Sequence, residues 1–435
     1  MKRIFFFALT AVAAMTSCSS DSDGVSDNGA GETLVPIEIT FAQNSMGTRG
    51  TGTVGDTVGG DNKWHNQIVH VFMLVKDSMK IAKFSGSPIY NNEEFATPGR
   101  INQTPFSGAY EGPSTSGIAR PTNDLVKYYP AQGKFSFYAY RLDDAIITSG
   151  PNLTADQDLN ISFKLNGSQD IMVAKALLTA TDSANLKIGE TEAIKEANVK
   201  RAFSAFAARH GVQPTLTFDH KLTRLTFNVV PKSGNTVDPV GGIIVDSIKV
   251  ISSTTEGKMT IAKIGIDANG AQYETGEQGI EWIANTVDSL SIMQRDTAWA
   301  YFTEPTAYTC TNIDSLNLVP LDSVDLRNRP IDKPVGIGEA LLLAPENSYK
   351  VCVFMHQWTM NTYTDGLTDK KQLASYKYED TIKLKNNRPF LEGTSYNVTI
   401  NLWGLEEIVI NTNLTPWDYN PNDDIEISPE ENLDE

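Results

Sequence analysis

The first segment with a clear hydrophobic pattern lies at residues 34–43. Its apolar positions, which alternate with more polar ones, are Val35, Ile37, Ile39 and Phe41. A period of two places successive side chains on opposite faces, which predicts a half-buried antiparallel β-strand. Residues 44–63 are rich in Gly, Thr, Asp and Asn, so we expect a loop after this strand.

Short strand-like segments separated by Gly, Pro and Asn continue along the chain. They are predicted at residues 68–76, 134–140, 160–163, 171–174, 216–220, 222–229, 243–250, 299–302, 341–343, 349–355, 396–402 and 408–410. Residues 85–123 predict long surface loops with room for one short strand, and Gly257-Lys258-Met259 predicts a turn. Short strands at this spacing favour β-sandwiches.

One helix is predicted, at residues 190–209. Acidic residues open it, Arg201 and Arg209 lie toward its end, and Gly211 follows. That order suits the helix dipole and its usual stop signal. Among so many strands we interpret the helix as an insertion on a β-sandwich.

The length of 435 residues exceeds that of one ordinary domain. A shift in composition near residue 214 predicts the boundary between two domains. We therefore expect an N-terminal β-sandwich domain at 34–213, a C-terminal one at 214–420 and an acidic tail at 421–435.

The N-terminus predicts export and lipidation. An apolar run from Ile4 to Met15 follows basic residues and is too short to span a bilayer, which is typical of a secretory signal over residues 1–17. Small residues before Cys18 resemble a bacterial lipobox, although Met15 stands where Leu is usual. The resemblance implies cleavage before Cys18, its acylation, and a firm lipid anchor; the alternative is an ordinary signal peptide. Residues 18–33 are predicted to be a lipidated flexible tether, and their Ser/Asp tract resembles an export tag for the cell surface.

Arg49 lies in the loop after the first strand and is the only basic residue between Arg3 and Lys63. A trypsin-like protease needs an extended, mobile segment that presents Arg or Lys. The sequence therefore predicts a proteolytic site between Arg49 and Gly50.

Composition excludes some partners. The 53 acidic against 36 basic residues give a net charge of −17, which disfavours nucleic acid because its phosphates would be repelled. The apolar fraction of 40% is sufficient for packed cores.

Catalytic and metal-binding motifs are missing from the sequence. The five histidines are scattered, and no His-Glu-x-x-His or Gly-x-Ser-x-Gly occurs. An EF-hand-like start at Asp156 has Ile161 in place of the required Gly and Gly167 in place of the required Glu. Gly257-Lys258 lacks the rest of a P-loop. We predict no enzyme activity and no cofactor.

Two cysteines remain besides Cys18. Cys310 and Cys352 have no neighbouring Cys or His at metal-ligand spacing, so a zinc site is not expected. They are either two buried free thiols or a disulfide pair. The six tryptophans are core residues or include a carbohydrate-stacking platform, and the sequence does not separate these alternatives.

Several short motifs in this order resemble those of the fimbrillins, the lipoprotein subunits of type V pili. They cover nearly the whole chain and are Ile37-Glu38-Ile39-Thr40-Phe41, Thr48-Arg49, Tyr128-Tyr129-Pro130, Phe135-Ser136-Phe137-Tyr138-Ala139-Tyr140, Gln169-Asp170-Ile171-Met172-Val173-Ala174, Leu216-Thr217-Phe218-Asp219-His220-Lys221-Leu222, Gly393-Thr394-Ser395-Tyr396-Asn397-Val398-Thr399-Ile400 and Pro416-Trp417.

The resemblance implies a mainly β fold of two transthyretin-like Greek-key β-sandwich domains with a short helical insertion. It further implies an outer-membrane lipoprotein precursor that an arginine-specific protease matures. Cleavage would remove the leader strand at 34–49, and a strand from another pilus subunit would replace it. Repetition of this heterologous contact gives an open head-to-tail filament.

The tail offers Ile425 and Ile427 as a donor strand, fewer apolar residues than the leader strand has. A stalk subunit must donate a strand, whereas a tip subunit need only accept one. Two alternatives remain: a pilus anchor subunit that keeps its lipid, and a surface-anchored glycan-binding lipoprotein.

Overall fold

The computed structural model describes most of the chain between residues 34 and 415. The described ranges are 34–43, 68–97, 116–123, 125–142, 145–153, 158–189, 191–232, 243–295, 318–326, 329–362, 368–402 and 408–415. Over these ranges the chain is mainly β, which confirms the predicted fold class.

The first sheet curls until its two ends meet. Its strands, in sheet order, are β1 (Ile39–Gln43), β11 (Thr215–His220), β10 (Met172–Ala176), β7 (Phe135–Arg141), β2 (Ile68–Val75), β5 (Glu93–Ala96) and β6 (Ser116–Pro121). β6 pairs again with β1, so the sheet is a closed barrel. β1 runs parallel to β11, and every other neighbouring pair is antiparallel.

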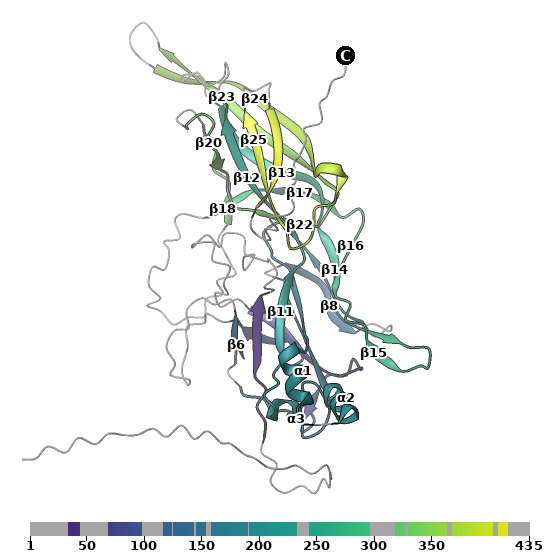
Figure 1. Cartoon of the computed structure of the whole chain (residues 1–435). Helices are drawn as coiled ribbons and strands as arrows, with labels where there is room; N and C mark the ends of the chain where they lie inside the picture. The colour runs from purple at the N-terminus through teal and green to yellow at the C-terminus, as the bar shows by residue number, and fades with distance from the viewer. Residues whose placement is uncertain are drawn as a thin grey trace, which may run out of the picture. The chain divides into compact units, whose positions relative to one another are not determined.

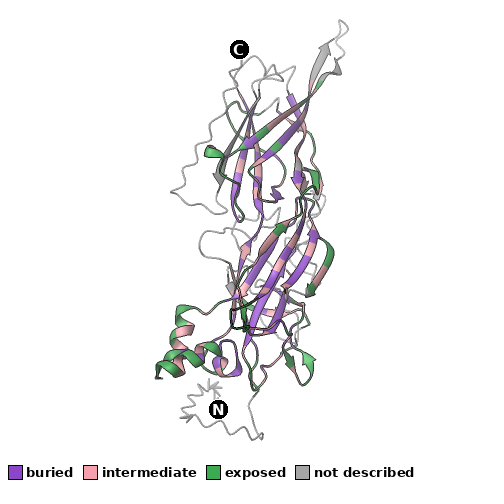
Figure 2. Ribbon diagram, turned by 90° about the vertical axis from the view of Figure 1, so that its right-hand side faces the viewer, coloured by how far each residue is buried: buried purple, intermediate pink, exposed green. Residues whose placement is uncertain are grey.

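β7 is buried along its whole length. Figure 2 shows buried residues along the strands of the sheets, whereas the helices are largely exposed. Phe135 and Phe137 point into the barrel core, whereas Tyr138 and Tyr140 belong to a second core outside the barrel. Burial on both faces explains why this strand has aromatic residues at consecutive as well as alternate positions.

A second sheet packs on the outside of the barrel to form a sandwich. Its strands, in order, are β15 (Gln272–Glu274), β14 (Glu256–Ile266), β9 (Asp158–Lys164) and β8 (Ile146–Leu153), with β16 (Gly279–Trp282) also paired to β14. Phe72 and Tyr140 of the barrel share a core with Ile161 and Met259 of this sheet. Such interdigitation of two inner faces is the usual core of a β-sandwich.

Two further sheets enclose the core of the C-terminal half. One contains β21 (Val335–Gly336), β12 (Thr223–Pro231), β25 (Ser395–Leu402), β26 (Ile408–Thr415) and β22 (Leu341–Leu343); the other contains β17 (Val287–Ser291), β13 (Ile243–Thr254), β23 (Ser348–Thr362), β24 (Thr368–Lys383) and β20 (Val324–Asp325). Small pairs are formed by β18 (Met293–Arg295) with β19 (Leu318–Pro320) and by β3 (Lys83–Phe84) with β4 (Ser87–Pro88), and a 3-10 turn spans Lys385–Asn387.

Three short helices lie in sequence between β10 and β11, where one helix at 190–209 was predicted. They are α1 (Ala180–Lys187), α2 (Glu192–Lys200) and α3 (Ala205–Arg209) (Figure 1). The single helix was wrong because the chain turns at Phe203, whose φ of 55° is left-handed and whose side chain is buried in the barrel core. The helices connect two antiparallel neighbours and are therefore an insertion.

The turn predicted at Gly257 was also wrong, because β14 runs through it. Gly257 pairs with Phe163 on one side and Trp282 on the other. A Cβ at this position would lie 2.8 Å from Ile280 and 3.0 Å from the Phe163 ring. Here glycine marks a close approach of neighbouring side chains within a strand.

Several other strands were missed or displaced. Residues 85–123, predicted as loops with room for one strand, contain β4, β5 and β6. β24 was missed because charged residues such as Lys377 and Glu379 break up its hydrophobic pattern. The strand predicted at 299–302 lies outside the described residues.

Strand pairing crosses the boundary that was predicted near residue 214. β11 completes the barrel next to β10, and β14 pairs with β9 in the second sheet. The division into two domains stays a prediction, and these two pairings show which strands it would separate.

Candidate functional site

β1 is the strand that closes the barrel. It fills the space between β11 and β6, and it is the purple arrow beside those two strands in Figure 1. Phe41 stands opposite Leu216 of β11 and Gly117 of β6. The backbone of β1 is therefore paired on both sides, whereas the pattern of residues 34–43 had predicted only antiparallel neighbours.

The residues just before β1 are held by a different segment. Ile37 N–H donates to the carbonyl of Lys127 at 2.9 Å, and Tyr129 N–H donates to the carbonyl of Val35 at 2.9 Å. Thr40 N–H then donates to the carbonyl of Pro214 at 3.0 Å. Residues 35–43, called the leader segment below, are thus hydrogen-bonded to parts of the chain that are distant in sequence.

The alternating side chains of this segment divide between core and surface. Ile37, Ile39 and Phe41 are 8%, 1% and 0% exposed, and Val35 packs half-buried against the same core. Glu38 between them is exposed. Each fully buried side chain of this size stabilises the fold by roughly 1.5–3 kcal/mol before entropy is subtracted.

Phe41 is fully buried in the barrel core and contacts two other aromatic rings. Its ring centroid is 5.3 Å from that of Phe218, edge-on at 76°, and 6.0 Å from that of Phe95. Edge-to-face contacts of this kind stabilise aromatic pairs beyond the area that they bury. Nothing in the sequence near Phe95 or Gly117 indicated this contact, because each residue lies in a segment with no hydrophobic periodicity.

The segment that holds Val35 and Ile37 is itself fixed by Lys127. Its ammonium group contacts Glu93 at 2.9 Å, donates to the carbonyl of Ile89, and lies 5.0 Å from the ring centroid of Tyr90. Burial raises the pKa of the Tyr90 hydroxyl well above its ordinary value, and the carboxylate of Glu93 adds to the shift. Tyr90 therefore stays neutral and packs in the barrel core, to which Ile37 and Phe41 also belong.

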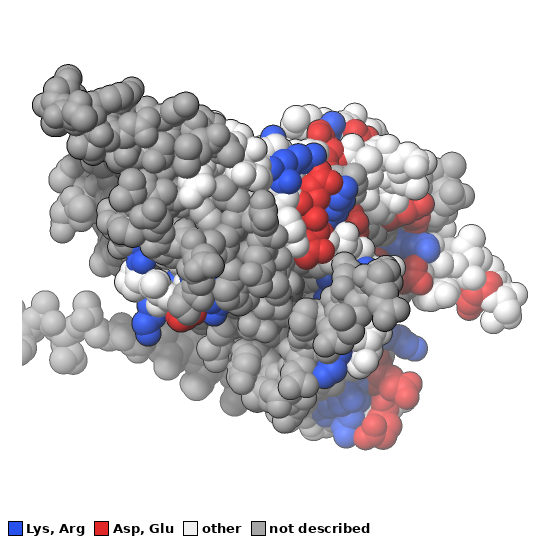
Figure 3. Space-filling view, turned by 90° about the horizontal axis from the view of Figure 1, so that it is seen from above, with Lys and Arg blue, Asp and Glu red and all other residues white. Residues whose placement is uncertain are grey.

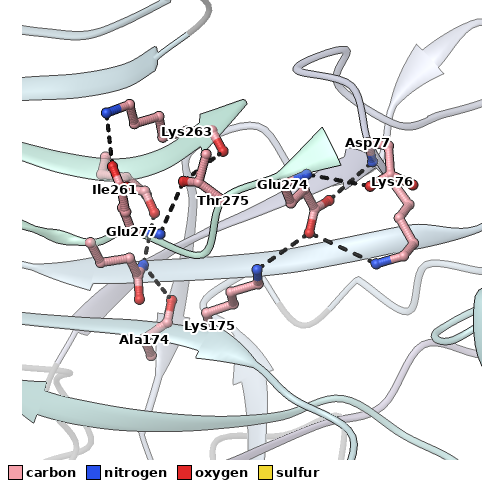
Figure 4. Close-up of polar contacts among 10 residues, drawn as sticks. Lys76, Asp77, Ala174, Lys175, Ile261, Lys263, Glu274, Thr275 and Glu277 are labelled. Carbon is pink, nitrogen blue, oxygen red and sulfur yellow. Dashed lines mark hydrogen bonds and ion pairs between the residues drawn. The ribbon is translucent and has the colours of Figure 1, made fainter. Parts of the chain in front are cut away.

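Glu274 joins the second sheet to the barrel through a buried carboxylate (Figure 4). Its Oε2 atom lies 3.4 Å from Lys175 Nζ and 4.0 Å from Lys76 Nζ, and its Oε1 atom accepts the N–H of Asp77 at 3.2 Å. Gln278 donates to the carbonyls of Ile261 and Ala174, so β10 is attached to β14 as well. These contacts fix the barrel wall from a side that does not involve β1.

Charges elsewhere on the described surface are mixed in sign. On the face drawn in Figure 3, basic and acidic side chains lie next to one another over the described part. Exposed pairs such as Lys263 with Glu277 at 2.8 Å are of this kind.

Several predicted site residues lie outside the described residues. They are Cys18, Arg49, Gly50, Cys310, Ile425 and Ile427. Cys352 lies buried on β23, and burial raises the pKa of its thiol. Its pairing with Cys310, the lipidation, the cleavage and the donor role of the tail all stay predictions.

Other candidate residues have structural surroundings. Among the tryptophans, Trp282 packs edge-on against Phe163 with centroids 6.0 Å apart. His70 stacks on Tyr140 at 5.0 Å, and burial lowers its pKa although Glu94 opposes the shift. Over the described ranges, no group of three or more His, Cys, Asp or Glu side chains is placed to hold a metal ion. No helix in the same ranges is long and apolar enough to cross a membrane.

The sequence matches the model of a protein family described as fimbrillin-like over residues 57–417. The chain belongs to the fimbrillin-like family. This match confirms the resemblance seen in the sequence motifs. No curated protein sequence matches the chain.

Solved structures of similar proteins include two bacterial fimbrial proteins. A fimbrial protein from Bacteroides vulgatus is 15% identical, with a TM-score of 0.44, and the match covers 88% of this chain and 99% of that one. The fimbrial anchor protein Mfa2 from Porphyromonas gingivalis is 9% identical, with a TM-score of 0.27, over 88% of this chain and 100% of that one.

Proposed function

We propose that this fimbrillin-like protein is a structural subunit of a cell-surface pilus. It is exported as a lipoprotein through Cys18, and β1 keeps it monomeric until an arginine-specific protease cuts after Arg49. A strand from another subunit then takes the place of β1, and repetition of this step builds the filament.

The observation that carries the proposal is the position of β1 in the barrel. Its removal would leave β11 and β6 with unpaired N–H and C=O groups along facing edges, and it would open the core around Phe41. An unpaired strand edge beside an open apolar core readily accepts another extended strand. A protein with this construction can be stored as a monomer and assembled after a single cut.

The location of the cut fits the same sequence of events. β1 ends at Gln43, and Arg49 follows a few residues later in a segment rich in Gly and Thr. A cut there separates β1 from the rest of the barrel without breaking any described strand. It also removes Cys18 and therefore the lipid.

The test is the variant Arg49→Ala in the native bacterium, with Lys63→Ala as a matched control at the next basic residue. We expect the unaltered protein and the Lys63→Ala protein in filaments to begin at Gly50 by N-terminal mass spectrometry. Arg49→Ala should keep the lipidated N-terminus and abolish filament assembly. Normal filaments that contain intact, lipidated Arg49→Ala protein would contradict strand release and would favour an anchor subunit.

A further inference from the structure

We propose that the Phe41 slot selects the incoming strand. The slot is the space that the Phe41 side chain fills, next to Phe95, Phe218, Leu216 and Gly117. The barrel accepts a strand that carries a large aromatic side chain at the position of Phe41, and this strand comes from a different subunit, not from the tail of another copy of this chain. The inference rests on the proposed function and adds the chemistry of the partner.

The surroundings of Phe41 fit an aromatic side chain. Phe218 and Phe95 face Phe41 from two different strands at 5.3 and 6.0 Å between centroids. On β6 the residue opposite Phe41 is Gly117, which has no side chain to compete for the space above the sheet. On β11 the residue opposite is the fully buried Leu216. A smaller side chain in this position would leave a cavity between two rings that cannot collapse onto each other.

The other inward positions of β1 make a weaker demand. Ile37 and Ile39 contribute aliphatic side chains, without a ring, to the same core. Aliphatic residues of several kinds fill such positions with little loss. Recognition is therefore concentrated at the end of the strand that carries the ring.

The tail of this chain does not supply that pattern. Aligning Ile425 and Ile427 with Ile37 and Ile39 places Pro429 in the slot of Phe41. Reversing the strand places Asp423 there instead. Proline lacks the N–H that pairs with a neighbouring strand, and a buried carboxylate without a partner is strongly unfavourable. Neither direction gives two aliphatic residues followed by an aromatic one.

The experiment uses the full chain with residues 44–50 replaced by the site of an unrelated sequence-specific protease. This replacement separates opening of the barrel from the natural cut at Arg49. After cleavage, fluorescent peptides compete with β1, and binding is followed by anisotropy. The first set is the peptide of residues 34–43 and its Phe41→Ala and Phe41→Leu forms. We expect losses in affinity of roughly 100-fold or more for Ala and about 10-fold for Leu.

A second set of peptides adds the ring to the tail. The peptide of residues 421–431 should bind at least about 100-fold more weakly than the leader peptide. Pro429→Phe in that peptide should recover much of the difference. Ser428→Phe is the matched control, because a neighbouring position on a strand faces the opposite side.

The outcomes separate the inference from the function on which it rests. If the unaltered leader peptide does not enter the cut protein, strand replacement is wrong and the inference falls with it. If it enters, and the Phe41→Ala form binds equally well, the aromatic slot is wrong while strand replacement stands. Tight binding of the unaltered tail peptide would likewise overturn the requirement for a different subunit.

Discussion

The carboxylates of Glu274 and Glu277 lie three positions apart and differ in burial. Glu274 is 5% exposed between Lys175 and Lys76, whereas Glu277 is 66% exposed and forms an ion pair with Lys263. A charge that is held away from water depends on its partners, because water cannot replace them. An exposed pair is already solvated and gains little from contact.

Replacing Glu274 by Gln should therefore lower the free energy of unfolding by about 1–3 kcal/mol. The change removes the charge that Lys175 and Lys76 face but keeps the shape of the side chain. Glu277→Gln, the matched control, should give no measurable change. Urea denaturation of both variants checks this, and equal effects would mean that the joint between β15 and the barrel does not depend on the buried charge.

Residues in the barrel also show how far sequence patterns reach. The alternation from Val35 to Phe41 was visible because it follows the period of a strand. The contacts of Phe41 with Phe95 and Phe218 were not visible, since they depend on which strands are neighbours in the sheet. The hydrophobic pattern within one strand predicts which face of the sheet a side chain lies on. The residues that it contacts depend on the order of the strands in the sheet.

At the scale of elements, the sequence carries a capping signal at the start of α1, where no helix was predicted. Thr179 accepts the N–H of Asp182 at 3.0 Å, and the Asp182 carboxylate accepts the N–H of Thr179 at 3.2 Å. This is a capping box, which satisfies two backbone donors at once. α2 also begins after a threonine, Thr191, but its side chain makes no capping hydrogen bond.

The two threonines make a matched pair of variants. Thr179→Ala should lower the free energy of unfolding by about 0.5–2 kcal/mol, because the first turn of α1 loses its cap. Thr191→Ala should have almost no effect, since no capping bond is lost. Thermal unfolding of both proteins measures the difference, and an equal loss would show that the capping box of α1 does not contribute.

Elements that depend on distant neighbours were the hardest to predict. β6 contains Gly117 and Ala119, which have little preference for strands, and it becomes a strand because β1 and β5 pair with it. β2, β7 and β10 were placed correctly because they are buried runs of apolar and aromatic residues. The predicted part of the site is thus β1 and its neighbour β11, and the part that was missed is β6, the strand on the other side of β1.

At the scale of the whole molecule, the hydrophobic residues form separate cores. The barrel core contains Ile37, Ile39 and Phe41, whereas the core enclosed by β12, β13, β23 and β25 contains no residue from β1. The loss of β1 therefore removes contacts from one core and leaves the other unchanged.

Hydrogen exchange can test this separation in the protein cut within residues 44–50. When β1 is displaced by mild denaturant, amides of β6 and β11 should exchange faster, because their hydrogen-bond partners leave. Amides of β13 and β23 should keep their protection and serve as the internal control. Equal loss of protection in all four strands would contradict independent cores.

The parallel pairing of β1 with β11 also has a consequence for how the chain folds. β1 is the first strand of the barrel to leave the ribosome, yet Thr40 pairs with Thr215, and every other strand of the barrel comes between them in the sequence. Contacts between such distant segments form late, because a long loop must close before they gain any stability. We expect each newly made chain to pass through a stage in which the other six strands of the barrel are paired and β1 is not yet bound between β11 and β6. Proteolysis would then return the mature subunit to a stage that the nascent chain has already visited.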